Sequence, residues 1–260
     1  MKVFSSAGGH GQHVQLPETR TIFINREQVD KFKNNSISTG KYTFITFLPK
    51  FLYEQFRKYA NIFFLTIGLL QQIPGISPTG KYVTLVPFLV ILAITALKEI
   101  VEDFKRHQED RKINDSQIQT VRNGTWEKIK WKHVCVGDIV MVKSEMFFPA
   151  DLVLLATSEE GSHCYIETAN LDGETNLKIR SALDATKHLK DAQQLYNFCG
   201  EIETEGPNKN LNDFSGNLIK QGGETIPIGP NEVLLRGPKL RNTKWMYGLA
   251  MLSILVQSQN

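Results

Sequence analysis

Two long apolar stretches separated by a short linker constrain the fold of this chain more than any other feature of its sequence. They cover residues 59–76 and 82–100. Each approaches the length of about 20 residues that an α-helix needs to cross a hydrocarbon core. The linker Ser77–Lys81 contains Pro78 and Gly80, which favour a turn. The pattern therefore predicts a hairpin of two transmembrane helices, and it fits a pair of helices buried in a soluble protein less well.

Basic residues on either side of this hairpin indicate its orientation. Lysines and arginines precede the first stretch and follow the second, whereas the linker contains Lys81 alone. Because positive residues stay on the cytosolic side, we expect both ends of the hairpin and the rest of the chain to face the cytosol. Residues 44–59 mix aromatic and basic side chains, which suits a helix at the level of the lipid headgroups.

Two adjacent glutamines, Gln71 and Gln72, lie near the exoplasmic end of the first stretch. An amide in hydrocarbon is costly unless it finds a hydrogen-bonding partner. Two interpretations are open at this point. The side chains reach into the polar interface, or they offer hydrogen bonds to a lipid headgroup where Pro74 and Gly75 loosen the helix.

Beyond residue 102 the pattern changes to short alternating runs typical of β-strands. The pair Asn123-Gly124 lies between two such runs and predicts a hairpin over 118–129. A helix is predicted at 184–198, ended by Gly200. Further strands are predicted at these segments: 137–142, 150–155, 163–168, 176–180, 214–220 and 233–236.

These patterns divide the chain into four parts. We expect a cytosolic N-terminal segment at 1–43, the helical membrane hairpin at 44–102, one all-β-rich cytosolic domain at 103–247 and a divergent tail at 248–260. Residues 1–13 have no apolar core, so no cleavable signal peptide is expected.

The bulk composition argues against two classes of function. The formal net charge of +3 is too small to argue for a nucleic-acid partner. The cysteines Cys135, Cys164 and Cys199 are widely spaced, without a C-x-x-C pair, which argues against a zinc site. Free thiols in a reducing cytosol fit this pattern.

The segment Asp172-Gly173-Glu174-Thr175 contains the candidate catalytic residues. The surrounding run from Tyr165 to Lys178 reads as a strand, a tight turn at Gly173 and a second strand. This arrangement puts the Glu174 carboxylate at the tip of a loop on a rigid β scaffold, where catalytic groups are often placed. As a bare tetrapeptide, the segment fits a solvated turn better than a catalytic site, and only its sequence context favours the catalytic interpretation.

Taken together, these motifs resemble the P-type ATPases, and within them the lipid-flipping (type IV) subfamily. The resemblance runs from about Arg20 to Tyr247. Its strongest parts are these: residues 46–56, the pair Gln71-Gln72 before Ile73-Pro74, residues 77–82, Val136-Gly137-Asp138-Ile139-Val140, Pro149-Ala150-Asp151 and the Asp172–Thr175 loop. Cation pumps carry Thr-Gly-Glu at the loop, so Asp172 and the following Asn176-Leu177-Lys178 look like the lipid pumps.

The resemblance implies that the β-rich domain is the actuator of an aminophospholipid flippase whose main cargo is phosphatidylserine. It assigns Glu174 to dephosphorylation of an aspartyl-phosphate intermediate, with Asp172, Gly173 and Thr175 shaping the loop. It assigns Gln71 and Gln72 to selection of the headgroup. It also implies ATP and Mg²⁺ as cofactors of the full-length enzyme, a two-span accessory subunit, and a Golgi, endosomal or plasma-membrane location.

Several parts of that family pattern are missing from these 260 residues. There is no Asp-Lys-Thr-Gly-Thr motif, no nucleotide-binding domain and no set of magnesium-binding aspartates. We therefore expect no ATP or metal to be bound by this chain and no turnover by it alone. The leading interpretation is the N-terminal portion of a flippase; the alternatives are a non-catalytic, membrane-anchored module that binds lipid or a partner, and a cation-pump fragment.

Overall fold

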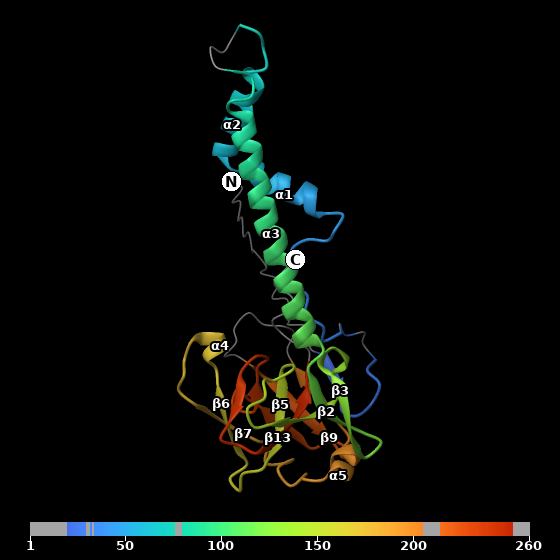
Figure 1. The fold of residues 1–260 in the computed structure, drawn as a ribbon. Helices are drawn as coiled ribbons and strands as arrows, with labels where there is room; N and C mark the ends of the chain where they lie inside the picture. The colour runs from blue at the N-terminus through green and yellow to red at the C-terminus, as the bar shows by residue number, and fades with distance from the viewer. Residues whose placement is uncertain (1–19, 30–31, 33, 76–79, 205–213, 252–260) are drawn as a thin grey trace, which may run out of the picture. The chain divides into compact units, whose positions relative to one another are not determined.

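The computed structural model describes residues 20–29, 32, 34–75, 80–204 and 214–251. The chain forms two compact units, one of residues 1–35 together with 117–260 and one of residues 36–116. Figure 1 shows the first as the β-rich part of the ribbon and the second as its helical part. The predicted linker at 77–81 and the predicted tail at 248–260 lie largely outside the described residues.

The described residues of the unit 36–116 form three helices: α1 (Phe47–Phe56), α2 (Tyr59–Leu70) and α3 (Leu85–Asn114). The helix α3 tolerates Pro87 because proline in the first turn removes no intrahelical hydrogen bond. Its last turn contains Arg111 and Lys112, whose charges suit the negative end of the helix dipole.

Within the part of the chain that the structure describes, no helix is both long enough and apolar enough to cross a membrane. The helix α2 has 12 residues, about 18 Å at 1.5 Å per residue, and ends at Leu70 rather than at 76. The helix α3 has 30 residues, but charged side chains begin at Lys98. The two predicted transmembrane helices at 59–76 and 82–100 are therefore not confirmed.

An extended segment, residues 37–41, is bound to the second half of α3. The backbone N–H groups of Ile37, Thr39 and Lys41 donate to side chains of Asn114 (2.8 Å), Asp110 (2.7 Å) and Asp103 (2.8 Å). These acceptors lie on one face of the helix because they are separated by four and seven residues. Asp103 and Asp110 are buried, so the segment covers them.

Replacing Asp110 with alanine is expected to release this segment. The change removes the acceptor of both the Thr39 N–H and the Thr39 hydroxyl, which binds at 2.8 Å. The loss of about 2 kcal/mol corresponds to roughly 30-fold faster exchange of the Thr39 amide hydrogen. Hydrogen exchange measures this directly, and Glu109→Ala, which removes an exposed carboxylate of the same helix, serves as the control. Unchanged protection of Thr39 in Asp110→Ala would show that the contact is dispensable.

The β-rich unit consists of a six-stranded sheet between two smaller ones. The central sheet has the order β11-β5-β13-β4-β2-β3, and the others are β1-β8-β9-β10 and β12-β6-β7. The pairs named in the strand registers are antiparallel. The strands of the central sheet are β2 (Gln117–Arg122), β3 (Thr125–Lys130), β4 (Ile139–Lys143), β5 (Leu152–Thr157), β11 (Val233–Leu234) and β13 (Trp245–Ala250).

The smaller sheets cover the two faces of the central one. The four-stranded sheet contains β1 (Arg20–Phe23), β8 (Gly200–Thr204), β9 (Gly216–Lys220) and β10 (Thr225–Ile228). The three-stranded sheet contains β6 (His163–Glu167), β7 (Lys178–Ser181) and β12 (Lys239–Arg241). The remaining elements are the 3₁₀ turn η1 (Trp131–His133) and the helices α4 (Ala169–Asp172) and α5 (Ala192–Asn197).

Alternation along β5 explains the layering. Val153 and Leu155 pack with Ile202 of the four-stranded sheet, whereas Leu152 and Leu154 pack with residues of the three-stranded sheet. Successive side chains of a strand point to opposite faces, so a wholly apolar strand must be covered on both. All six residues of β5 are buried, as this arrangement requires.

The predicted hairpin at Asn123-Gly124 is confirmed. The strands β2 and β3 pair in register from Gln117↔Lys130 to Arg122↔Thr125. Both turn residues have positive φ, 51° and 73°, as a type I′ turn demands. The strands predicted at 137–142, 150–155, 163–168 and 176–180 correspond to β4, β5, β6 and β7.

Other elements differ from the prediction. The helix predicted at 184–198 is shorter and forms only at Ala192–Asn197. The strand β1, in the predicted N-terminal segment 1–43, pairs with β8 because Ile22 and Ile24 are buried in the core. At the other end, β13 continues to Ala250, past the predicted boundary at 247, because it lies between β4 and β5.

Candidate functional site

The loop between β6 and β7 carries the candidate catalytic residues. The predicted tight turn is instead one helical turn, α4, followed by Gly173 in the left-handed conformation (φ +77°). The backbone N–H of Gly173 donates to Ala169 O at 3.1 Å, which closes the turn. Glycine adopts this conformation without the steric cost of a Cβ atom, so the chain can leave the helix sharply here.

Asp172 is the centre of the hydrogen bonds in this loop. Its carboxylate accepts from the Thr168 hydroxyl at 2.9 Å, from the backbone N–H of Glu174 at 2.9 Å and from the Lys178 ammonium at 2.5 Å. These contacts, with Lys178 the strongest, lower the pKa of Asp172 to about 2. Asp172 is therefore an acceptor that fixes the loop rather than a group that exchanges protons near neutral pH.

Glu174 lies on the exposed side of the loop. Its side chain is 58% exposed, and its carboxylate lies 3.0 Å from the Lys178 ammonium. An exposed carboxylate at the end of a strand-supported loop can reach a group on another domain and accept a proton from a water molecule there. Thr175 follows as an exposed residue of the same loop.

The structure thus brings together Asp172, Gly173 and Glu174, and it adds two residues to which sequence reasoning assigned no role in the site. Thr168 precedes α4 and binds Asp172, while Lys178 begins β7 and binds both carboxylates. The spacing of four residues between Glu174 and Lys178 is a weak signal of this contact, because the intervening chain is not helical.

An ion-pair cluster lies beside the start of the loop, on the adjoining strands. The Arg241 guanidinium donates to Glu167 at 2.6 Å and also binds Glu145. Lys239 binds the same Glu145 carboxylate at 2.7 Å. Glu167 immediately precedes Thr168, so these contacts of β12 fix the strand from which the loop departs.

Gln71 and Gln72 belong to the helical unit, which is described separately. The Gln71 backbone N–H donates to Ile67 O at 2.9 Å as α2 ends. The Gln72 amide donates to Gly68 O at 3.2 Å and to Lys81 O at 2.7 Å. Gln72 therefore links the end of α2 to the chain that leads into α3, a structural role that the sequence did not indicate.

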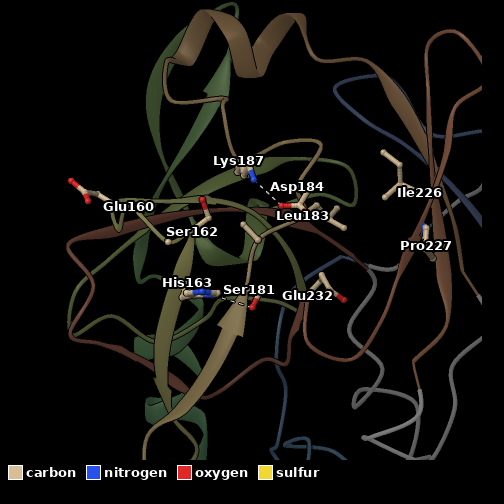
Figure 2. Close-up of a pocket in the computed structure, with 12 residues that line it drawn as sticks. Glu160, Ser162, His163, Ser181, Leu183, Asp184, Lys187, Ile226, Pro227 and Glu232 are labelled. Carbon is tan, nitrogen blue, oxygen red and sulfur yellow. Dashed lines mark hydrogen bonds and ion pairs between the residues drawn. The ribbon is translucent and has the colours of Figure 1, made fainter.

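A hollow of about 610 Å³ lies at the far ends of β6 and β7. Figure 2 shows His163 beside Ser181, joined at 3.0 Å, and Lys187 beside Asp184, joined at 2.9 Å. The register pairs His163 with Ser181 and Ile166 with Lys178, so the hollow is at the opposite end of these strands from the Glu174 loop. Lys187 pairs with Asp184, whereas the carboxylates of Glu160 and Glu232 also line the hollow and leave it with a net negative charge.

Within the described residues, no group of three His, Cys, Asp or Glu side chains is arranged to hold a metal ion. The cysteine thiols at Cys135, Cys164 and Cys199 are free. Burial raises the pKa of the Cys164 thiol to about 12, so Cys164 is a packing residue rather than a nucleophile.

A sheet-rich unit that displays a carboxylate loop of this kind has the architecture of an actuator domain. Residues 112–222 match the family model of the P-type ATPase actuator domain, and residues 21–85 match that of the phospholipid-translocating ATPase N-terminal region. The first match covers the loop of Glu174, and the second covers Gln71 and Gln72.

Curated relatives refine this class. The chain is 48% identical over 244 residues to phospholipid-transporting ATPase tat-1 of Caenorhabditis elegans, covering 94% of this chain and 21% of that protein. It is 43% identical over 241 residues to phospholipid-transporting ATPase DRS2 of Saccharomyces cerevisiae (91% and 18%). It is also 43% identical over 238 residues to human phospholipid-transporting ATPase ID (91% and 20%).

The chain belongs to the type IV, phospholipid-transporting P-type ATPases. It spans about a fifth of the length of the curated relatives that it matches. The relatives are named as ATPases, so the family is enzymatic.

Proposed function

We propose that this chain is the N-terminal portion of an ATP-driven flippase that moves an aminophospholipid, chiefly phosphatidylserine, from the exoplasmic to the cytosolic leaflet. The observation that carries the proposal is the Asp172–Thr175 loop, with Glu174 exposed on a fixed β scaffold inside an actuator domain. The phospholipid-transporting relatives support the lipid as cargo.

In this proposal Glu174 acts in the hydrolysis of an aspartyl phosphate formed elsewhere in the full-length enzyme. A water oxygen forms a bond to phosphorus while the bond to the aspartyl oxygen breaks, and the water proton passes to the Glu174 carboxylate. The products are inorganic phosphate and the free aspartate. Gly173 allows close approach of the loop, because no neighbouring atom lies within 4 Å of the position that its Cβ would take.

ATP and Mg²⁺ supply the phosphoryl group and its charge neutralisation in the parts of the enzyme beyond this chain. Rotation of the actuator couples hydrolysis to the helices as a rigid-body switch. Because the three sheets share buried clusters, the unit can turn as one body without deforming the loop.

We further propose that α2 and α3 meet lipid. Many of their large apolar side chains are exposed, including Phe63 (60%), Leu69 (58%), Ile91 (61%) and Leu97 (63%). An apolar surface of this extent is unfavourable in water and requires a lipid or protein cover. The Gln71 and Gln72 amides would then contribute to selection of the lipid headgroup. The actuator domain would lie in the cytosol.

The family resemblance also supports a two-span accessory subunit and a Golgi, endosomal or plasma-membrane location as proposals. Nothing among these observations favours the non-catalytic short module over the flippase.

A transport assay tests the function. The full-length protein that contains this segment is reconstituted in vesicles with fluorescent phosphatidylserine, phosphatidylethanolamine or phosphatidylcholine, and loss of label from the exoplasmic leaflet is followed. We expect transport that requires ATP and Mg²⁺ and is fastest for phosphatidylserine. Equal rates for the three lipids would exclude the aminophospholipid preference, and ATP hydrolysis stimulated by a cation but not by lipid would favour a cation pump.

A further inference from the structure

The Glu174 loop has little apolar packing to hold its shape. Its residues from Asn170 to Thr175 are exposed or nearly so, and Leu171 and Leu177 remain 37% and 41% exposed. A Cβ atom placed on Gly173 would meet nothing within 4 Å. The polar contacts of Asp172 are therefore the main constraint on the conformation of this loop.

Among those contacts, Lys178 has a distinct position. Among the described residues, the Thr168 hydroxyl and the Glu174 N–H donate to Asp172 and not to the Glu174 carboxylate, whereas the Lys178 ammonium reaches Asp172 at 2.5 Å and Glu174 at 3.0 Å. It is the side chain of the described loop that touches both carboxylates. The negative charges that flank it also raise the pKa of Lys178, so the ammonium stays charged throughout the physiological range.

The backbone of Lys178 is fixed by the sheet. It begins β7 and pairs with Ile166 of β6, which is 2% exposed. The neighbouring carboxylate of Glu167 is already bound by Arg241 at 2.6 Å and does not compete for the ammonium. Lys178 thus joins a rigid strand to an otherwise weakly supported loop.

We infer that Lys178 is a positioning residue for Glu174 in the hydrolysis of the phosphoenzyme. Its ammonium, 3.0 Å away, fixes the direction of the Glu174 carboxylate that accepts the water proton. This inference rests on the proposed function. Small displacements of a reacting group reduce rates strongly, whereas an exposed ion pair contributes little to fold stability. Lys178 is therefore expected to affect the rate of hydrolysis much more than the stability of the domain.

The first test uses the full-length protein. Phosphoenzyme is formed from labelled ATP, and its decay is followed after a chase with unlabelled ATP. We expect Lys178→Gln to slow decay about 10-fold and Lys178→Arg to recover most of the rate, because the guanidinium keeps the charge. The melting temperature should change little in either variant.

The chain offers a closely matched control. Lys220 also forms a 3.0 Å pair with a glutamate four positions away, Glu224, and it has comparable exposure. It lies on β9, at a hairpin of the other small sheet. Lys220→Gln is expected to leave phosphoenzyme decay within about twofold of the wild type.

A second measurement does not depend on turnover. In the 260-residue chain in detergent micelles, the carboxyl carbon resonance of Asp172 reports its titration. We expect the carboxyl group of Asp172 to titrate with a midpoint of about 2 in the wild type. In Lys178→Gln the midpoint should rise toward about 3.9, the value of an unperturbed aspartate. Lys220→Gln should leave it unchanged.

The outcomes separate this inference from the proposed function. If Glu174→Gln slows decay but Lys178→Gln decays like the wild type, the positioning role is wrong and the function stands. If Glu174→Gln itself decays like the wild type, the proposed function fails and the inference with it. Equal slowing in Lys178→Gln and Lys220→Gln, or an unchanged Asp172 midpoint in Lys178→Gln, would also overturn the positioning role.

Discussion

Replacing Glu174 with glutamine is expected to trap the full-length enzyme as its phosphoenzyme, with hydrolysis slowed by about 100-fold or more. The amide keeps the size of the side chain but cannot accept the proton of the attacking water. Glu174 is 58% exposed, and its only ion pair among the described contacts is to Lys178, so the fold should be unaffected. Labelled phosphoenzyme should form at the normal rate and persist after the chase.

Two controls make this result specific. Glu224→Gln removes the carboxylate of the matched pair with Lys220 and should leave decay unchanged. The variant Glu174→Asp retains a carboxylate base but shortens its reach, so it should show only part of the wild-type decay rate. Normal decay in Glu174→Gln would assign the proton to another group and remove the basis for the proposed mechanism.

Replacing Asp151 with alanine is expected to cause the largest loss of stability among these variants, about 3 kcal/mol. Asp151 is fully buried, and its carboxylate accepts from the Arg236 backbone N–H at 2.7 Å. The Arg236 guanidinium in turn donates to the Asn35 side chain at 3.0 Å, and Asn35 donates to Trp131 O and Pro149 O. Removing the carboxylate leaves a buried donor unsatisfied beside a buried cation.

Hydrogen exchange of the β5 amides measures this loss, because those amides open only with the whole unit. Asp151→Asn retains an acceptor oxygen and should lose less than Asp151→Ala. The control Asp184→Ala removes a carboxylate that is 94% exposed and should stay within about 0.5 kcal/mol of the wild type. Equal protection in the alanine variants of Asp151 and Asp184 would show that the buried network contributes nothing.

The buried contacts of Asp151 give a physical reason for the Pro149-Ala150-Asp151 motif. Pro149-Ala150-Asp151 is part of the resemblance to the P-type ATPases, yet the sequence does not say what the aspartate does. In the structure it binds the backbone of Arg236, 85 residues later in the bend between β11 and β12, and the Arg236 guanidinium in turn binds Asn35. Its role in this unit is structural, in contrast to the exposed carboxylate of Glu174.

Local patterns in the sequence predicted the features that depend on neighbouring residues. Asn123-Gly124 forms the predicted hairpin because both residues tolerate positive φ. Alternating and wholly apolar runs identified β4, β5, β6 and β7, because side-chain burial follows the period of a strand. The loop motif identified the family, which the matching family models and relatives bear out.

Where the sequence prediction was wrong, a competing local or tertiary effect explains the difference. The segment 184–198 has helical composition, but residues 184–188 form turns between Leu183 and Leu189, which are both buried in the core. The turn at Gly173 contains a helical turn because Thr168 and Asp172 close it through their side chains. The helix α2 ends at Leu70, ahead of Pro74 and Gly75, the latter at φ +87°.

The sequence alone therefore determined the family and the β-rich character of the domain that it placed at 103–247, and it singled out the Glu174 loop as a candidate, because these depend on residue type and short-range spacing. The tertiary structure alone decided that β1 pairs with β8, about 180 residues later in the chain, and that the Asp151 carboxylate binds the Arg236 backbone, 85 residues away. Such contacts depend on which surfaces the strands bury against one another. No local period encodes that choice, since any apolar strand face could have been covered by several partners.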